Sequence, residues 1–565
     1  MTLLSSSLSP SEATRFRSAI AYLQAGQSAS ALRIARDLIA QAPRAADAWQ
    51  LLGMCLADTR MPGEAERAFE RALALAPGNA TVLRNYATSF ARLGKGLRAD
   101  TLYESAVPVL RKALALAPDL ASTWVDLGVA LRMSGRIDEA LTAYRRAESL
   151  LDPDSAGSLA VTDAITGVLA DSGRTDEALV HAQQLVARHP RMTFAHETLS
   201  RLLREHGAEQ TPDEDPFGSF LAAASAQPDN HELQLGLARM LLSAERADEA
   251  LHVLDRLRGA LDAADPLLDW FTADALDMLH MPDRAARLYA AADRSGLGKM
   301  PAFLNAYARH AFRTGTFDLA EALAGRAIGV EPHNQEAWAH RGTAWRLAGD
   351  AREDWLCDYD RLVAYVEVPP PDGYPDASIF LDALTEALAR LHGASRAPIS
   401  QSVRGGTQTA GQLFGRDNEV IQATERATRA AVETWLAALP KDLHHPFLGR
   451  RMSSVRWAGS WSVRLKASGR HSNHIHPQGW ASSAFHVSVP SGVRDANSPA
   501  RDGWLQFGAP LESLGLDLSP RRMIRPAPGY LALFPSYMWH GTVPFDAPES
   551  RLTIAFDMQP NEKAD

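Results

Sequence analysis

Cysteine is nearly absent from this 565-residue chain, which contains only Cys55 and Cys357. Two cysteines so far apart have neither the spacing of a zinc-binding motif nor the number needed for a disulfide framework. Basic residues are not in excess either, because 58 Lys and Arg stand against 67 Asp and Glu, giving a net charge of -9. This balance predicts neither a nucleic-acid surface nor a polybasic membrane patch.

Long apolar runs are also missing. No stretch of about 18 apolar residues occurs, so the sequence predicts no transmembrane helix. The first eight residues, MTLLSSSL, have no basic residue and no long apolar core, which predicts no signal peptide. We therefore expect a cytoplasmic protein that binds no membrane and no nucleic acid.

The first 350 residues contain an internal repeat with a period of about 34 residues. The clearest unit matches the tetratricopeptide pattern at every signature position. Its pattern residues are Trp49, Leu52, Gly53, Leu56, Ala65, Phe69, Ala72 and Pro77. A second unit has Trp124, Leu127, Gly128, Leu131, Ala140, Tyr144 and Ala147 in the same order.

These residue types have a physical reason. Small Gly or Ala lets two antiparallel helices approach closely, large residues fill the space between neighbours, and proline ends the second helix. The unit between the two clear ones is too long, with the excess around Gly94 to Thr101. Weaker units follow, and Gly207–Pro216 is polar and acidic, which predicts a loop. We predict roughly eight or nine helical hairpins over residues 12–355.

Such a repeat array stacks into a solenoid and usually presents a concave surface to a partner. We therefore expect a protein or peptide partner for residues 12–355. The alternative is that the array serves only for dimerisation or rigid spacing. The sequence leaves the oligomeric state open.

The composition changes after the repeats. Four prolines within Val366–Pro375 exclude a helix there, and a domain boundary is expected nearby. Residues 377–392 and 418–439 return to helical spacing, whereas Ser402–Phe414 is rich in Gly, Thr and Gln and predicts a loop. We divide the remaining chain into a linker with a connecting helix, residues 356–400, and a β domain, residues 401–562.

Beyond Trp457 the sequence predicts short strands closed by Gly and Pro. The predicted strands are Ser460–Lys466, Ala481–Val489, Gly503–Phe507, Gly529–Phe534, Gly541–Pro544 and Leu552–Asp557. This number of short strands favours a double-stranded β-helix of the jelly-roll type with flanking helices. The fold class expected for the whole chain is α+β and multidomain, with an all-α tetratricopeptide solenoid first.

The candidate site is built from histidines in the β domain. His474 and His476 are two residues apart, so in an extended segment both side chains point to the same side. His540 follows a predicted strand and can supply a third ligand. Three ligands on one face leave open positions for a substrate and O2, as in non-haem Fe(II) oxygenases, whose usual set is two His and one carboxylate.

A bidentate 2-oxo acid bound to such a metal has a second carboxylate, which needs a buried cation. Arg551 lies in the strand after His540, and its planar guanidinium suits a carboxylate. Thr553 lies two residues further on the same strand face and can donate a hydroxyl hydrogen bond to that carboxylate. We predict a cofactor-binding role for both.

These segments resemble the 2-oxoglutarate/Fe(II)-dependent oxygenase superfamily, with its His-x-Asp/Glu, distal His and Arg-x-Ser/Thr pattern. They resemble more narrowly the oxygenases fused to tetratricopeptide repeats in bacteria, over about residues 400–560. The similar segments are Arg404–Thr409, Asn473–Trp480 and Pro528–Ser536. The resemblance implies Fe(II), 2-oxoglutarate and O2, with decarboxylation to succinate and CO2 and hydroxylation of a C–H bond. It assigns His474 and His540 as ligands and Arg551 to 2-oxoglutarate.

The chain departs from the superfamily at the middle ligand, where His476 stands in place of Asp or Glu. We predict the set His474, His476 and His540, which is one charge more positive than the usual site. Two alternatives stay open: His476 lies outside the ligand set with water in its place, or His471 replaces one of the pair.

Further residues near the motif are weaker candidates. Trp480, Phe485 and Trp539 either wall the pocket or pack in the core, and packing is the more common role for such residues. His486 is a candidate for a hydrogen bond to the co-substrate. Arg464 either holds a substrate anion or lies at the surface.

We predict an Fe(II)/2-oxoglutarate hydroxylase whose substrate is recognised by the repeat array. One alternative is a non-catalytic adaptor with a degenerate oxygenase-like domain. Another is a cupin-type metalloenzyme that uses no oxo acid. The sequence does not indicate the substrate.

Overall fold

The computed structural model describes residues 8–100, 102–206, 215–260, 265–393, 402–494 and 500–561. The chain forms two compact units, Met1–Val168 and Leu169–Asp565. The predicted loop Gly207–Pro216 lies almost wholly outside the described residues. Among the described residues, no helix has both the length and the apolar composition of a membrane span.

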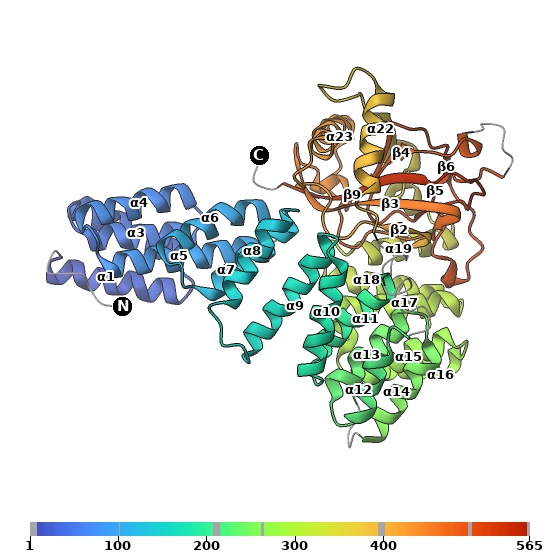
Figure 1. The fold of residues 1–565 in the computed structure, drawn as a ribbon, viewed down its shortest axis with the longest axis horizontal. Helices are drawn as coiled ribbons and strands as arrows, with labels where there is room; N and C mark the ends of the chain where they lie inside the picture. The colour runs from blue at the N-terminus through green and yellow to red at the C-terminus, as the bar shows by residue number, and fades with distance from the viewer. Residues whose placement is uncertain are drawn as a thin grey trace. The chain divides into compact units, whose positions relative to one another are not determined.

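Unit 1 consists of consecutive helices that pack in pairs, shown in blue to cyan in Figure 1. The helices of these pairs are α1 (Pro10–Gln24), α2 (Ser28–Gln41), α3 (Ala46–Asp58), α4 (Pro62–Leu75), α5 (Ala80–Ala99), α6 (Tyr103–Leu116), α7 (Ala121–Met133) and α8 (Ile137–Glu148). The pairs are α1 with α2, α3 with α4, α5 with α6 and α7 with α8. The predicted tetratricopeptide repeats are confirmed.

The small residues of the pattern lie where two helices of a pair touch. A Cβ atom added at Gly53 would come within 2.7 Å of the Phe69 ring, and one at Gly128 within 2.7 Å of the Tyr144 ring. Each glycine therefore makes room for the aromatic residue of the second helix. The predicted excess in the middle unit extends α5, which runs for 20 residues.

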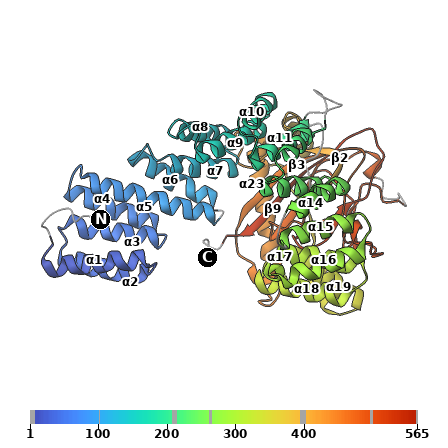
Figure 2. The same cartoon turned by 90° about the horizontal axis from the view of Figure 1, so that it is seen from below.

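Unit 2 begins with more helices of the same kind, shown in green in Figures 1 and 2, while α9 (Ala156–Asp171) spans the boundary between the units. These helices are α10 (Thr175–Arg188), α11 (Thr193–His206), α12 (Gly218–Ala226), α13 (His231–Ser243), α14 (Ala247–Ala260), α15 (Pro266–Met278), α16 (Pro282–Arg294), α17 (Pro301–Arg313), α18 (Phe317–Val330) and α19 (Gln335–Ala348). Two short helices follow, α20 (Arg352–Leu356) and α21 (Tyr359–Leu362).

A repeated hydrogen bond joins several of the prolines that end a unit to the next helix. The Trp124 indole donates to the carbonyl of Pro118 at 2.8 Å, and Trp338 donates in the same way to Pro332 at 2.9 Å. In the unit after Pro190, where no Trp occurs, His196 Nε2 lies 3.1 Å from the Pro190 carbonyl. The unit after Pro190 thus keeps the hydrogen bond to the proline carbonyl, with His196 in place of Trp.

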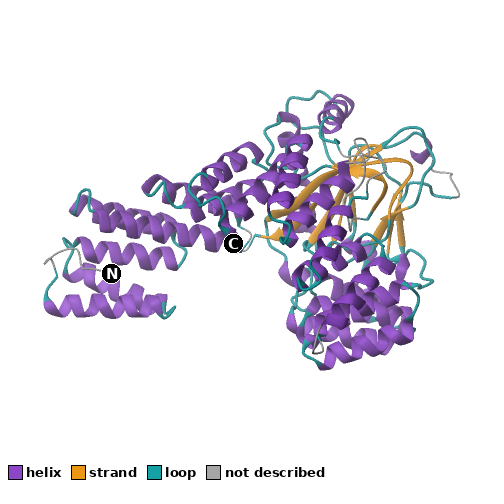
Figure 3. Cartoon of the chain, turned by 60° about the horizontal axis from the view of Figure 1, so that its bottom comes forward, coloured by secondary structure: helices purple, strands orange, loops and turns teal. Residues whose placement is uncertain are grey.

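The rest of unit 2 is rich in β-structure, drawn in orange in Figure 3. Its strands are β1 (Ala364–Glu367), β2 (Val403–Gln408), β3 (Val455–His471), β4 (Ala481–Ser488), β5 (Leu505–Phe507), β6 (Arg522–Ile524), β7 (Tyr530–Pro535), β8 (His540–Thr542) and β9 (Arg551–Pro560). One antiparallel sheet has the order β1-β7-β4-β9-β3-β2, and a smaller one has the order β6-β5-β8.

Three of these strands were not predicted, and the loop prediction for Ser402–Phe414 is wrong over its first half. Residues 403–408 form β2 on the edge of the large sheet, with a register shift between Arg404 and Gly406. Gly405 has φ +67° there, so the glycines that suggested a loop instead form a bulge. β1, at the other edge, comes from the segment that we expected to be a linker.

Two helices pack beside the large sheet, α22 (Ala377–Ala389) and α23 (Glu419–Ala438), as predicted from their helical spacing. Glu425 of α23 accepts a hydrogen bond of 2.7 Å from the Trp457 indole of β3. The side chain of His392, just after α22, lies 3.1 Å from the Ser462 hydroxyl. Both contacts reach the side of the sheet opposite to the cavity described below.

Candidate metal centre

Backbone pairing brings two of the predicted ligands together. His540 is the first residue of β8, and His474 lies in the segment after β3. The two residues form an isolated antiparallel bridge, with N–H···O distances of 2.9 Å and 3.0 Å in the two directions. Their ring centroids are consequently only 4.3 Å apart.

His476 joins this pair from the same segment. Its backbone N–H donates to the Ser536 carbonyl at 3.0 Å, which fixes the chain just before the turn that leads to β4. Its Nε2 lies 3.2 Å from Nε2 of His474. The three histidines form the cluster of potential metal ligands among the described residues, with ligand atoms within 4.8 Å of one another.

Each of these rings is oriented by an acceptor at its Nδ1 atom. His474 Nδ1 lies 2.8 Å from the Ser472 carbonyl, and His540 Nδ1 lies 2.9 Å from the Met538 carbonyl. His476 Nδ1 lies 2.6 Å from Oδ1 of Asp557. Carbonyls and carboxylates only accept, so we assign the proton to Nδ1 in all three rings. In a neutral ring with this tautomer Nε2 carries no proton and is able to bind a metal.

The surroundings also favour neutral rings. Burial, followed by the neighbouring His540 and His476 rings, lowers the pKa of His474 well below its ordinary value. Burial and then His476 lower the pKa of His540 in the same way. Neutral imidazoles keep the lone pair that binds a metal, so the cluster is suited to a cation and not to a protonated network.

Arg551 occupies the position predicted for it, at the start of β9. The side chain is 2% exposed, and burial lowers its pKa to about 10, with Tyr365 acting in the opposite direction. One terminal nitrogen donates to the Gly503 carbonyl and the other lies 3.4 Å from Nδ1 of His486. Its Nε atom is buried and has no hydrogen-bond partner among the described residues.

His486 of β4 lies directly beside these groups, because it pairs with Thr553 across the sheet. It is fully buried, and burial followed by the Arg551 charge lowers its pKa well below its ordinary value. Since Nδ1 faces an Arg551 donor, the proton belongs on Nε2, which is buried without a hydrogen-bond partner among the described residues. Arg551 and His486 thus each leave one buried donor unpaired, which is costly unless an acceptor binds it.

A cavity of about 320 Å³ connects the histidines with this basic end. Its wall includes Thr553, Ala555 and Asp557, which are every second residue of β9 and therefore lie on one face of that strand. The wall also includes His540 and Thr542 from the smaller sheet. The cavity thus lies between the two sheets. The small Ala555 side chain leaves space between the histidine cluster and Arg551.

The remaining sequence candidates have different places. His471 lines the cavity, but its Nδ1 is 3.0 Å from the Ser402 hydroxyl, and it is not part of the three-histidine cluster. Trp480 is buried against Phe447, with ring centroids 4.6 Å apart.

Phe485 lies in the hydrophobic core, and the Trp539 indole donates to Thr343 of α19. Arg464 faces away from the cavity, because its neighbour Val463 lines it and successive strand residues alternate. The suggested substrate-anion role of Arg464 is therefore not supported.

Asp557 is the functional candidate that sequence reasoning missed. It is 6% exposed and accepts hydrogen bonds from His476 and, at 2.7 Å, from the Ser482 hydroxyl. Arg551, Thr553 and Asp557 are separated by multiples of two residues, so in a strand all three side chains point to the same face. That signal could have been read in the sequence.

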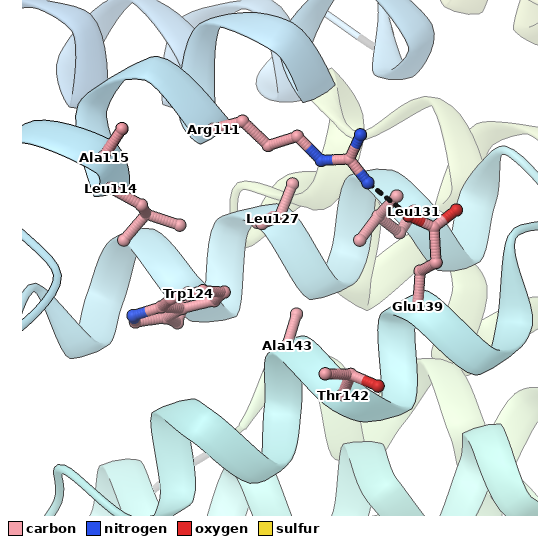
Figure 4. Close-up of a pocket in the computed structure, with 9 residues that line it drawn as sticks. All are labelled: Arg111, Leu114, Ala115, Trp124, Leu127, Leu131, Glu139, Thr142 and Ala143. Atoms are coloured by element: carbon pink, nitrogen blue, oxygen red, sulfur yellow. Dashed lines mark hydrogen bonds and ion pairs between the residues drawn. The ribbon is translucent and has the colours of Figure 1, made fainter.

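A second hollow, of about 380 Å³, belongs to unit 1 and is drawn in Figure 4. It lies among α6, α7 and α8, with Leu114, Leu127 and Leu131 forming an apolar part. An ion pair between Arg111 and Glu139 lies at its side (Figure 4).

Comparison with known families agrees with both parts of the chain. Residues 459–557 match the family model described as "Putative 2OG-Fe(II) oxygenase". Residues 16–80 and 79–152 match models described as "Tetratricopeptide repeat". The oxygenase match includes His474, His476, His540, Arg551 and Asp557.

Two characterised relatives share part of the chain. Protein O-mannosyl-transferase TMTC1 of Mus musculus is 31% identical over 151 residues, which are 26% of this chain and 16% of that protein. Cellulose synthase operon protein C of Xanthomonas axonopodis pv. citri (strain 306) is 31% identical over 196 residues, 33% of this chain and 12% of that protein. The chain thus spans about a sixth or less of the length of these relatives.

Among solved structures, MamA from Desulfovibrio magneticus RS-1 is 20% identical, with a TM-score of 0.25, over 32% of this chain and 95% of that one. YrrB, described as a TPR protein with an unusual peptide-binding site, is 21% identical, with a TM-score of 0.25, over 32% of this chain and 89% of that one.

Proposed function

We propose that this chain is an Fe(II)- and 2-oxoglutarate-dependent hydroxylase. The proposal starts from its tetratricopeptide repeats and from the 2OG-Fe(II) oxygenase domain at residues 459–557. The observation that carries this proposal is the convergence of His474, His476 and His540, whose ligand atoms lie within 4.8 Å of one another. With the tautomer assigned above, the Nε2 lone pairs of His474 and His476 face each other at 3.2 Å and repel unless a cation lies between them. Nitrogen ligands of this kind suit Fe(II).

The arrangement of the sheets supports a jelly-roll fold for the β domain. All strand pairs are antiparallel, and the cavity lies between a large and a small sheet, as in a double-stranded β-helix. In such a fold, ligands from both sheets can face one interior site. Here His540 comes from the small sheet and Arg551 from the large one.

The basic end of the cavity fits the distal carboxylate of 2-oxoglutarate. Arg551 and Thr553 both line the cavity, and Arg551 Nε is a buried donor without a hydrogen-bond partner among the described residues. His486 lies beside Arg551, and its Nε2 is likewise buried without a partner among those residues. A carboxylate accepts several hydrogen bonds at once, so it would satisfy donors that the protein itself leaves unpaired. We assign Arg551 and Thr553, with His486, to co-substrate binding.

Bound Fe(II) would supply the O2-dependent chemistry that converts 2-oxoglutarate to succinate and CO2 and hydroxylates a C–H bond of the substrate. The protein's own part is to hold and orient the reactants. The carbonyls of Ser472 and Met538 keep two ligand rings turned inward, and Arg551 fixes the co-substrate from the far end. Burial of these groups keeps bulk water from competing for the same hydrogen bonds.

The repeats support recognition of a protein or peptide partner, which is the usual use of such arrays. The apolar hollow with the Arg111–Glu139 pair (Figure 4) is a candidate surface in unit 1. The cytoplasmic location predicted from the composition remains part of this proposal.

The test is release of succinate from 2-oxoglutarate in the presence of Fe(II), O2 and ascorbate, with and without a panel of peptides. We expect turnover by the native chain and loss of turnover in His540→Ala. His444→Ala is a suitable control, because this histidine is exposed and lies outside the cavity. If the native chain releases no more succinate than the protein-free background, the proposal is wrong and an adaptor role is favoured; equal release above that background by the native chain and His540→Ala would remove His540 from the catalytic site.

A further inference from the structure

His476 stands where the usual site of this type has a carboxylate ligand, so three neutral histidines would leave Fe(II) with one more positive charge. A carboxylate is nevertheless present one step further out. Oδ1 of Asp557 lies 2.6 Å from Nδ1 of His476, on the side of the ring opposite to Nε2. The three-histidine set lacks the negative charge of a carboxylate ligand. Asp557 supplies such a charge next to His476, the residue that replaces that ligand.

The other groups around Asp557 leave its charge to interact mainly with His476. The other hydrogen bond given to its side chain comes from the neutral Ser482 hydroxyl at 2.7 Å, and Ser482 lies 2.7 Å from the Ser536 hydroxyl. No Lys or Arg side chain forms an ion pair with Asp557 within the part of the chain that the structure describes. A buried carboxylate with no cationic partner is costly to maintain, so its charge needs another explanation.

The sheet register explains how the contact forms. Asp557 pairs with Ser482 on one side and with Gly459 on the other. Ser482 provides a donor, whereas Gly459 has no side chain, and a Cβ atom there would come within 3.1 Å of the Trp461 ring. Gly459 thus makes room for Trp461, and the His476 ring stacks on that indole, with ring centroids 5.6 Å apart and planes 22° apart.

We infer that Asp557 is a positioning residue that acts through His476 and restores to the metal site the negative charge of a carboxylate ligand. The inference rests on the proposed function, since it concerns the same metal. A short charge-assisted hydrogen bond from Nδ1–H to Asp557 fixes the tautomer and makes Nε2 a stronger donor to a cation. His476 and Asp557 together thus do the work of the missing aspartate or glutamate.

The experiment is a double-mutant cycle on Fe(II) affinity, measured without O2 and without 2-oxoglutarate so that turnover plays no part. The four proteins are the native chain, Asp557→Asn, His476→Ala and the double variant. Asparagine keeps the size of the side chain and an acceptor oxygen but removes the charge. We expect Asp557→Asn to weaken Fe(II) binding about 10- to 100-fold in the native background. In the His476→Ala background the same change should alter the affinity by less than about threefold, because the coupling is lost.

Two further variants separate charge from structure. Asp382→Asn makes the same chemical change at an exposed position of α22 and should leave the Fe(II) affinity unchanged. Ser482→Ala removes the other hydrogen bond to Asp557 but keeps its charge, and should weaken Fe(II) binding less than about threefold. Thermal unfolding of each metal-free variant confirms that the proteins compared are folded at the assay temperature.

The outcomes are distinct. If the native chain binds Fe(II) and Asp557→Asn binds it equally well, the inference is overturned while the proposed function stands. The inference is also overturned if Asp557→Asn weakens binding equally with and without His476, since Asp557 would then act on the metal directly. An equal loss in Ser482→Ala would show that packing and not charge is responsible. If the folded native chain binds no Fe(II), the proposed function fails together with the inference.

Discussion

The indole of Trp539 donates a hydrogen bond of 2.9 Å to the hydroxyl of Thr343, and both side chains are buried. Thr343 belongs to α19, the last long helix of the repeat array, and Trp539 immediately precedes the candidate ligand His540. The neighbouring Tyr537 hydroxyl donates to the Leu356 carbonyl of α20 at 2.7 Å. The turn that presents His540 is therefore held by the helical part of unit 2.

This relationship predicts that a change in α19 weakens the metal site. Thr343→Val leaves the Trp539 N–H buried without an acceptor, which we expect to lower the free energy of unfolding by about 1–3 kcal/mol. Because the next residue is His540, Fe(II) affinity should also fall several-fold. Urea denaturation and anaerobic Fe(II) titration measure the two effects.

The matched control for that change is Thr428→Val. Thr428 is a buried helical threonine whose hydroxyl donates, among the described residues, to the carbonyls of Thr424 and Glu425 in its own helix. We expect Fe(II) affinity to be unaltered there. Equal Fe(II) affinity in Thr343→Val and the native chain would argue against support of the site by α19.

Alanine variants of the histidines should show which side chains bind Fe(II) and which only lie nearby. His474→Ala and His540→Ala each remove one of the three converging histidines, and we expect each to weaken Fe(II) binding by about 100-fold or more. His471→Ala should retain binding within about tenfold, because His471 bonds Ser402 and lies outside the cluster. Loss of Fe(II) in His471→Ala together with retention in His474→Ala would reverse the assignment.

Co-substrate binding should depend on the arginine inside the cavity. Arg551→Gln removes the buried cation, and we expect it to weaken 2-oxoglutarate binding by about 2 kcal/mol or more, roughly 30-fold. Fe(II) affinity should change little, since Arg551 is not a ligand. Arg464→Gln, on the adjoining strand but facing away from the cavity, is the matched control and should bind 2-oxoglutarate normally. Normal 2-oxoglutarate binding by Arg551→Gln would contradict the role given to Arg551. A native chain that binds Fe(II) but no 2-oxoglutarate would favour a cupin-type enzyme that uses no oxo acid.

A pH effect on stability is expected from His392, which lies away from the metal centre. Burial, and then the Arg464 charge, lower its pKa to about 4, while an unfolded histidine titrates near 6.5. The unfolded state therefore binds the proton first as the pH falls. The stabilisation is complete above about pH 6.5 and is lost between about 6.5 and 4, by about 3 kcal/mol.

The check is urea denaturation at several pH values between 7 and 4.5 for the native chain and His392→Gln. We expect the variant to lose less free energy of unfolding over this range, by the equivalent of nearly one proton. Parallel pH curves for the two proteins would show that His392 does not contribute.

Much of the repeat array was accessible from the sequence because its signal is local and periodic. Gly53 and Phe69 could be paired by their spacing alone, and the structure places them in contact. The edge strands were not accessible in this way. β1 is only four residues long and β2 is interrupted by Gly405, so neither has an alternating pattern, and both depend on long-range pairing.

The candidate site shows the same division. The spacing of His474 and His476 and the order of His540 and Arg551 were visible in the sequence, and the structure brings the three histidines together. The role of each as a ligand stays a prediction. The contacts of Asp557 with His476 and of His486 with Arg551 join residues far apart in the chain, and only the sheet register makes them neighbours.

The most direct test of this account is the absorption spectrum of the protein after Fe(II) and 2-oxoglutarate are added without O2. Chelation of Fe(II) by the oxo acid in the site should produce a visible charge-transfer band. We expect the band in the native chain and expect it to be absent in His540→Ala. A folded native chain that gives no such band and binds neither Fe(II) nor 2-oxoglutarate would contradict the account.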